Sequence, residues 1–109
     1  MKLDKLVHEP ARLVILTVLA EADEMEFRFL KEISGLNKGN LSGHLSKLEE
    51  AGYVAVEKFF RGKVPVTSLK ITRAGRTALQ QYRAQLKEVL HPKQGVLTAI
   101  KKRLQSASS

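Results

Sequence analysis

The chain has 109 residues, of which 43% are hydrophobic and 28% are charged, and it has no cysteine. This length suits one compact domain, so we expect no separate catalytic or ligand-sensing domain. The absence of cysteine excludes disulfides, thiolate metal ligands and cysteine nucleophiles. The longest apolar run, residues 13–20, is shorter than the ~20 residues of a membrane-spanning helix and no signal-peptide pattern is present, so we expect a cytoplasmic protein without membrane contact.

Charge is distributed unevenly along the chain, whose net charge is +8. Residues 1–57 carry 7 Lys and Arg against 10 Asp and Glu, whereas residues 58–109 carry 12 Lys and Arg against Glu88 alone. Such a basic half attracts polyanions, and nucleic acid is the usual one because cationic side chains release counterions from phosphates. A basic surface that only keeps the protein soluble is the alternative.

Two helices are predicted in the first third of the chain. Apolar residues that follow Pro10 predict a buried helix over residues 9–21, because proline is tolerated in a first helical turn. The acidic residues 21–26 predict a loop. Apolar residues at helical spacing then predict a second helix from residue 27 to Ser34-Gly35, where glycine favours a helix end.

A third helix is predicted directly after a short turn that contains Gly35. Asn37 can cap this helix, which we expect to end at Ala51-Gly52. Its apolar stripe, expected to face the core, consists of Leu41, Leu45 and Leu48.

The pattern then changes from helical to alternating. Residues 53–60 predict a strand, residues 61–63 a turn and residues 64–71 a returning strand, which together form a β-hairpin with a cationic tip. Phe59 and Phe60 are adjacent and face opposite sides of a regular strand, so we expect one in the core and the other in an exposed packing surface.

Thr72 can cap a long helix over residues 73–90, which Pro92 interrupts. One more short helix is predicted after Pro92, followed by a disordered tail from Gln105 to Ser109. Apolar residues repeat at spacings of three and four in both helices: Leu79, Tyr82, Leu86 and Val89 in the first, and Val96, Leu97, Ile100 and Leu104 in the second.

These two stripes lead us to expect a homodimer. A domain of three short helices and a hairpin cannot cover both, so a partner chain is the natural cover. The alternative is a last helix that folds back over its own domain. The residues expected in the dimer interface are Leu79, Tyr82, Leu86, Val89, Leu97, Ile100 and Leu104.

The order of these elements resembles that of winged helix-turn-helix regulators of the MarR-like and ArsR-like type. The resemblance spans roughly residues 9–90 and is carried by residues 36–54, 60–67 and 69–76 in the same order as in that family. Within them lie the leucine spacing, a Glu-Glu-Ala-Gly sequence, a glycine at the hairpin tip and a Thr-x-x-Gly helix start.

The resemblance implies an α+β fold that is mainly α with a small β-hairpin. It implies a winged helix-turn-helix domain over residues 1–90 and, over residues 91–109, a terminal dimerisation helix with a tail. It also implies a regulator that binds double-stranded DNA, with the recognition helix, about 37–51, in the major groove and the wing, about 54–71, on the backbone or in the minor groove.

The recognition helix supplies most of the candidate DNA contacts. Asn40 can pair with adenine, Lys47 can reach a guanine edge or a phosphate, and Lys38 suits a phosphate. For His44 we favour partial burial over a phosphate contact, and the lack of a side chain at Gly43 makes direct base reading there doubtful. An ordinary solvated helix face is the alternative for each residue. The candidates are Lys38, Gly39, Asn40, Ser42, Gly43, His44, Ser46 and Lys47 on the helix, and Arg61, Gly62 and Lys63 at the wing tip.

Phosphate contacts are expected of the wing and its base. Arg61 and Lys63 flank the tip glycine and can reach the backbone or the minor groove. The residues expected to line the base of the wing are Lys58, Lys70, Arg73 and Arg76.

Two other classes of function compete with DNA binding. An enzyme is disfavoured because the sequence has three scattered histidines, no glycine-rich phosphate loop after a strand and no carboxylate pair beside a nucleophile. We expect no cofactor, and no metal site because His8 and His91 have no partners at ligand spacing. A winged-helix module for protein assembly or RNA contact is the other alternative. No cluster of residues identifies a small-molecule effector.

Overall fold

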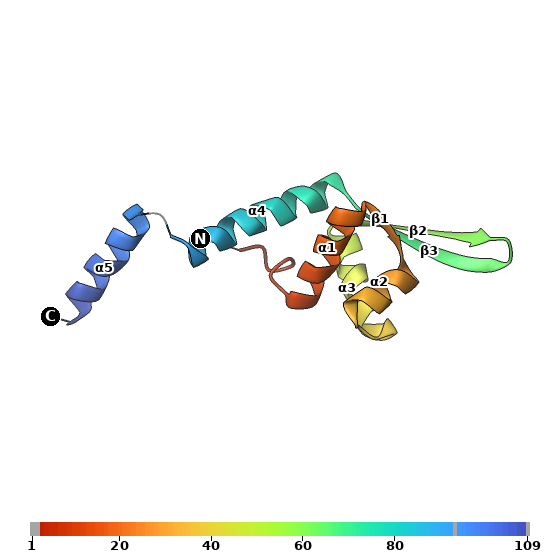
Figure 1. Ribbon diagram of the computed structural model, residues 1–109, viewed down its shortest axis with the longest axis horizontal. Helices are drawn as coiled ribbons and strands as arrows, with labels where there is room; N and C mark the ends of the chain where they lie inside the picture. The colour runs from red at the N-terminus through yellow and green to blue at the C-terminus, as the bar shows by residue number, and fades with distance from the viewer. Residues whose placement is uncertain (1–2, 93, 109) are drawn as a thin grey trace.

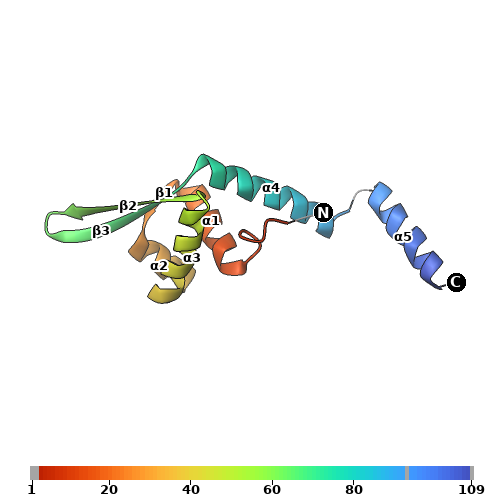
Figure 2. The same cartoon turned by 180° about the vertical axis from the view of Figure 1, so that it is seen from behind.

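The computed structural model describes residues 3–92 and 94–108. A helical body carries a β-hairpin at one end, and a long helix followed by the last helix extends from the other end (Figure 1). The molecule measures 72 × 25 × 21 Å along its principal axes, so it is strongly elongated. From behind, the hairpin and the last helix again lie at opposite ends (Figure 2). No helix among the described residues combines the length and the apolar character needed to cross a membrane.

The first three helices are α1 (Pro10–Ala22), α2 (Phe27–Ser34) and α3 (Lys38–Glu50), and all three predicted helices are confirmed. The residues predicted to end α2 and to begin α3 adopt the expected local geometry. Gly35 follows α2 with φ of +70°, which costs glycine little, and the Asn37 side chain accepts a hydrogen bond of 2.8 Å from the amide of Asn40. These two caps fix the short turn between α2 and α3.

Three strands form one antiparallel sheet in the order β1-β3-β2. They are β1 (Glu24–Glu26), β2 (Val54–Arg61) and β3 (Val64–Ile71). The prediction of a loop over residues 21–26 was therefore wrong for β1. This strand has no apolar alternation of its own, and it exists because its backbone pairs with β3, with Glu24 opposite Lys70 and Glu26 opposite Ser68.

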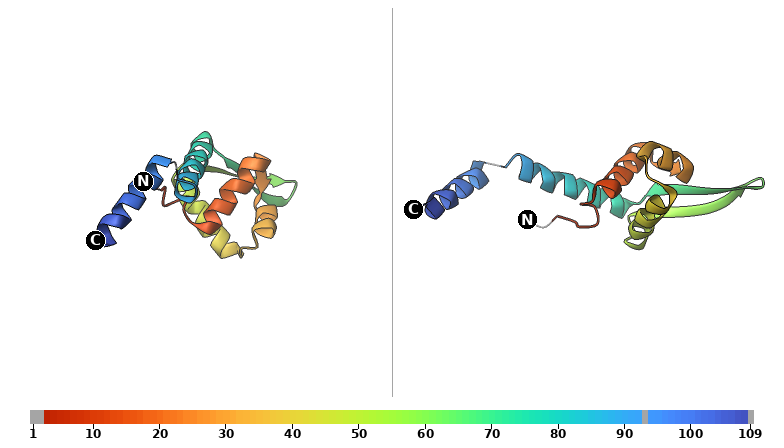
Figure 3. Two further views of the ribbon diagram at one scale, coloured as in Figure 1. Left: turned by 60° about the vertical axis from the view of Figure 1, so that its left-hand side comes forward. Right: turned by 90° about the horizontal axis from the view of Figure 1, so that it is seen from below.

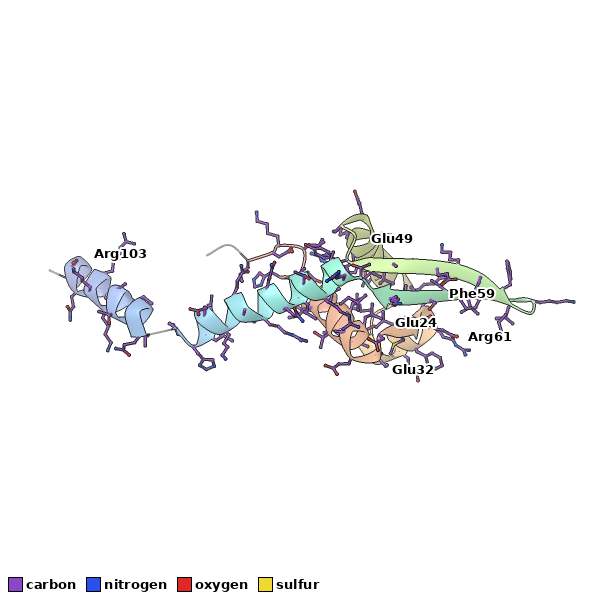
Figure 4. The ribbon with its side chains drawn as sticks, turned by 90° about the horizontal axis from the view of Figure 1, so that it is seen from above. Glu24, Glu32, Glu49, Phe59, Arg61 and Arg103 are labelled. Carbon is purple, nitrogen blue, oxygen red and sulfur yellow. The ribbon has the colours of Figure 1, made fainter. Side chains whose placement is uncertain are left out.

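The hairpin turns through Gly62 and Lys63, with Gly62 at φ of +65°. A positive φ at the first central residue matches the right-handed twist of the two strands. The expectation that Phe59 or Phe60 lies in the core was wrong, since they are 38% and 73% exposed. Both belong to the outer part of the hairpin, beyond the residues of β3 that pair with β1, and Figure 4 shows Phe59 on this projecting part.

The core lies between α1, α2, α3, the inner half of the sheet and the first half of α4 (Arg73–Leu90). The predicted stripe of α3 is confirmed, because all three of its leucines are buried. Burial of large aliphatic side chains, about 1.5–3 kcal/mol each, is therefore what anchors α3 to the body. The most fully buried side chains are Val7, Ile15, Leu16, Leu19, Leu30, Leu41, Leu48, Val54, Leu69 and Leu79.

The last two helices are α4 and α5 (Gln94–Ser108), with a break at His91 and Pro92. Thr72 caps α4 as predicted, since its hydroxyl accepts a hydrogen bond of 3.0 Å from the amide of Gly75. The prediction of a disordered tail from Gln105 was wrong up to Ser108, because no glycine or proline after Gly95 interrupts the last helix. Ser109, and the side chain of Val96 in the predicted stripe, lie outside the described parts of the chain.

The expected interface residues fall into three groups, which are buried, half-buried and exposed. Leu79 and Tyr82, only 1% and 4% exposed, belong to the core of their own chain, so their assignment to a dimer interface was wrong. The cover is the segment before α1, which the sequence had not placed: Val7 is fully buried, and His8 Nδ1 lies 2.8 Å from the Tyr82 hydroxyl. Leu86 is half-buried, and the exposed members are Val89, Leu97, Ile100 and Leu104.

The start of α4 packs directly against the backbone at the start of β2. The Tyr53 carbonyl accepts a hydrogen bond of 3.0 Å from the amide of Thr72, and the Thr72 hydroxyl donates one of 2.6 Å to the Gly52 carbonyl. A Cβ at Gly75 would overlap the Tyr53 carbonyl oxygen and lie 2.9 Å from Ile71 Cγ1. This position therefore requires glycine for space.

We predict that Gly75→Ala lowers the free energy of unfolding by about 1–3 kcal/mol, because a backbone oxygen has to move to admit the methyl group. The matched control is Gly43→Ala, since Gly43 lies in α3 with open space where the methyl group would stand. That change raises helix propensity and adds about 0.5–1 kcal/mol. Urea unfolding followed by circular dichroism measures both, and an unfolding midpoint for Gly75→Ala at or above that of the wild type contradicts the steric account.

Candidate nucleic-acid interface

The surface of α3 that faces away from the core is polar and exposed. The three leucines of α3 pack into the core, so the side chains on the opposite face of the helix project outward. All but one of the helix residues proposed as DNA contacts are exposed, namely Lys38, Gly39, Asn40, Ser42, Gly43, Ser46 and Lys47. The exception is His44.

His44 is half-buried beside α1, which confirms the favoured expectation of partial burial. Its Nδ1 lies 3.1 Å from Arg12 Nη1 and 3.8 Å from Glu9 Oε2. A guanidinium can only donate, so Nδ1 accepts this hydrogen bond. His44 therefore links the recognition helix to α1, on the side of α3 away from the hairpin.

A groove separates α3 from the hairpin. Its inner part, about 530 Å³, is lined from α3 by Lys38, Ser42 and Ser46 and from the hairpin by Lys58 and Thr67. An outer part of about 470 Å³ continues toward the hairpin tip and shares Lys38 and Thr67 with the inner part. The groove thus connects the start of α3 to the tip, whereas Asn40, Gly43 and Lys47 lie on α3 outside its lining.

Two positively charged residues, Arg61 and Lys63, lie at the tip of the hairpin. Lys63 is exposed in the turn, and Arg61 extends back to Glu26, with 2.7 Å between Arg61 Nη2 and Glu26 Oε1. Glu26 also accepts a hydrogen bond of 3.2 Å from Arg28 Nε. The Arg61 hydrogen bond, together with the positive charges of Arg61 and Arg28, lowers the pKa of Glu26 below its ordinary value. The carboxylate therefore stays ionised at neutral pH.

The guanidinium of Arg76, one of the residues expected at the base of the wing, contacts the helical body. Its Nη1 donates a hydrogen bond of 3.1 Å to the Ala20 carbonyl, and its Nη2 pairs with Asp23. The guanidinium therefore binds the carboxyl end of α1, where a cation is favoured by the helix dipole. Lys58, Lys70 and Arg73 remain exposed, and Lys58 lines the groove.

Two charged residues of the outer groove were not among the predicted site residues. Glu26 and Arg28 line the outer part of the groove, next to Arg61 and Lys38. Glu26 lies in the acidic segment for which the sequence predicts a loop, and 35 residues separate it from Arg61. No local spacing pattern could have connected them, because the pairing depends on how the hairpin returns over α2.

Helices joined by a tight turn, an outward-facing third helix and a cationic hairpin beside it define the winged helix-turn-helix class of DNA-binding domains. The comparison with known protein families supports the same class. Residues 11–90 match the family described as winged helix DNA-binding domain, so the chain belongs to that family. This membership confirms the predicted fold and the prediction of a DNA-binding protein rather than an enzyme.

Similar proteins come from archaea and bacteria. An uncharacterized protein of Methanocaldococcus jannaschii is 42% identical over 79 residues, which cover 72% of this chain and 85% of that protein. The transcriptional regulator homologue from Pyrococcus horikoshii OT3 has a TM-score of 0.76 at 28% identity, covering 80% of this chain and 86% of that one. A MarR mutant from E. coli complexed with operator DNA shares the fold, with a TM-score of 0.62 at 19% identity over 95% and 84% of the two chains.

We predict that the double change Arg61→Ala and Lys63→Ala weakens binding about equally for all duplex sequences and lowers the slope of log affinity against log salt by about two units. The reason is that phosphates carry no sequence information. Fluorescence anisotropy across a salt series measures the slope. The control Lys87→Ala with Lys101→Ala removes two lysines from α4 and α5, away from the groove. Equal slopes for the wild type and the tip variant contradict the assignment of the wing.

Proposed function

We propose that this protein is a transcriptional regulator that binds double-stranded DNA sequence-specifically as a homodimer. The observation that carries the proposal is the polar, exposed surface of α3 next to a groove whose other wall is the hairpin. In this proposal α3 enters the major groove and the hairpin contacts the backbone or the minor groove. Residues 1–90 act as the DNA-binding domain and residues 91–109 as the dimerisation segment.

Base reading falls to the first turns of α3. Asn40 carries an exposed amide that can donate to and accept from an adenine edge, and Lys47 can reach a guanine edge two turns further on. Lys38, at the start of the helix and in the wall of the groove, suits a phosphate. Gly43 has open space above it, so the helix backbone itself can come close to the DNA at that point.

We predict that Asn40→Ala or Lys47→Ala costs roughly 1–3 kcal/mol on the preferred site and much less on random duplex DNA. The preferred site is first selected from bound genomic fragments. Titrations of both DNAs with each variant, at one salt concentration, give the two losses. An equal loss on both DNAs contradicts base reading and leaves these residues with phosphate contacts only.

The salt series on wild-type protein separates DNA binding from the alternative of a protein-assembly module. A steep decrease of affinity for random duplex with rising salt supports DNA binding, because it reports released counterions. A flat dependence contradicts the proposal. Competition between duplex DNA and double-stranded RNA of one length then distinguishes DNA binding from RNA contact.

The proposed dimer is held by the last two helices. Val89 in α4 and Leu97, Ile100 and Leu104 in α5 are exposed. The three α5 residues repeat at spacings of three and four, the spacing of a seam between two helices. Two further views show α5 apart from the body of its own chain (Figure 3). A second copy is the natural cover, and it brings a second recognition helix to a successive major-groove face about 34 Å away.

We predict that Ile100→Glu converts the dimer into a monomer, because it places a charge in the seam. The matched control is Ala99→Glu, which adds the same charge to an exposed position one residue away, about 100° around α5. Light scattering at micromolar concentration measures the mass against 12.2 kDa for one chain. A wild-type mass near 12.2 kDa, rather than about twice that, contradicts the dimer and the paired half-sites.

A further inference from the structure

The outer half of the hairpin has little support from the body. β1 pairs with β3 only at residues 68–70, so residues 58–67 extend beyond the three-stranded part of the sheet. Figure 4 shows Phe59 and Arg61 on this projecting part, with Glu24 and Glu32 on the body. Its orientation relative to α3 therefore depends on whatever else connects it to the helices.

Glu26 makes that connection. It is the last residue of β1 and directly precedes α2, so its backbone is fixed on both sides. Among the described residues, its ion pair with Arg61 is the one hydrogen bond or ion pair between side chains that joins residues 58–67 to the body. The Glu26 side chain is 19% exposed, whereas that of Arg61 is 61% exposed. The Glu26 carboxylate is thus packed against the body, whereas much of the Arg61 side chain stays accessible to solvent.

We propose that Glu26 is a positioning residue for DNA binding, which holds Arg61, and with it the outer hairpin, in the orientation that contacts a backbone phosphate. The proposal rests on the proposed function, since it assigns the tip arginine to DNA. A guanidinium has five N–H donors, and the hydrogen bond to Glu26 uses one on Nη2. The remaining donors can bind phosphate while the side chain is already ordered.

The charges around Glu26 favour this role over competition with DNA. Arg28, Lys38 and Arg61 line the outer groove together with Glu26, so three cations and one carboxylate share it and its net charge attracts phosphate. Ordering a long side chain on binding weakens association, and an arginine that is already held avoids that loss. Removal of the Glu26 charge therefore has two opposed effects on DNA affinity. The groove becomes more positive, which strengthens binding, and the Arg61 side chain becomes less ordered, which weakens it.

Glu24 offers the control that separates these effects. It lies two residues away on the same strand, and its Oε1 accepts a hydrogen bond of 2.8 Å from the Ser68 hydroxyl, so it does not hold Arg61. Glu24→Gln and Glu26→Gln change the net charge of the full-length protein identically. A difference between them in affinity for random duplex DNA therefore reports the pairing of Glu26 with Arg61 or Arg28, and the Arg61→Ala background separates these two partners.

We expect Glu26→Gln to bind random duplex DNA about 2- to 10-fold more weakly than Glu24→Gln at the same salt concentration, the factor set by ordering one side chain. In an Arg61→Ala background the two variants bind equally, because nothing is left to position. If Glu26→Gln binds as tightly as Glu24→Gln, or more tightly, the proposal is overturned. A difference that persists without Arg61 overturns it as well.

A measurement without DNA keeps this test separate from that of the proposed function. Hydrogen exchange of the paired strand residues Phe59 and Val66 should be faster in Glu26→Gln than in Glu24→Gln, because the outer hairpin opens more often. Unchanged exchange overturns the positioning role whatever the affinities are. If exchange changes as expected but the wild type binds duplex DNA without salt dependence, the proposed function is at fault.

Discussion

Helix α3, the hairpin and the long helix α4 meet where the backbone at Gly52 and Tyr53 lies against Thr72 and Gly75. Thr72 contributes twice there, as the cap of α4 and as a hydrogen-bond donor to the carbonyl of Gly52, just after α3. The absence of a side chain at Gly75 lets the two backbones touch. Because these contacts involve backbone atoms, they fix the angle between the three elements more strictly than apolar burial, which has no preferred direction.

Next to this junction, the buried leucines of α3 determine which face of the helix is exposed to solvent. Every large apolar residue of the helix points into the core, so its outward face is free for polar recognition. His44 adds a hydrogen-bonded link to Arg12 of α1. The groove beside α3 follows from the same arrangement, since its floor is the inner face of the sheet, with Val56 and Leu69.

Local signals in the sequence were sufficient for the helices and the hairpin. The caps at Asn37 and Thr72 and the glycine after α2 act within four residues, and the leucine spacing of α3 is a property of the helix alone. Contacts between distant segments were not predictable from them. The strand β1 depends on β3, the cover over Tyr82 comes from the segment before α1, and Glu26 meets Arg61 across 35 residues. Phe59 and Phe60 obey the strand period but lie beyond the part of the sheet that has a core.

The division of α4 into a buried first half and an exposed second half makes it a rigid spacer. Its 18 residues span about 27 Å at 1.5 Å per residue. Since each residue also turns the helix by about 100°, length and rotational phase cannot be varied separately. Inserting one residue in the exposed half would swing the terminal seam to a different side of the body, whereas two whole turns, about seven residues, would nearly restore its direction while moving it outward. In the proposed dimer, the spacing between the two copies of α3 can therefore change only in steps that preserve the helical phase, or through changes at the break near Pro92.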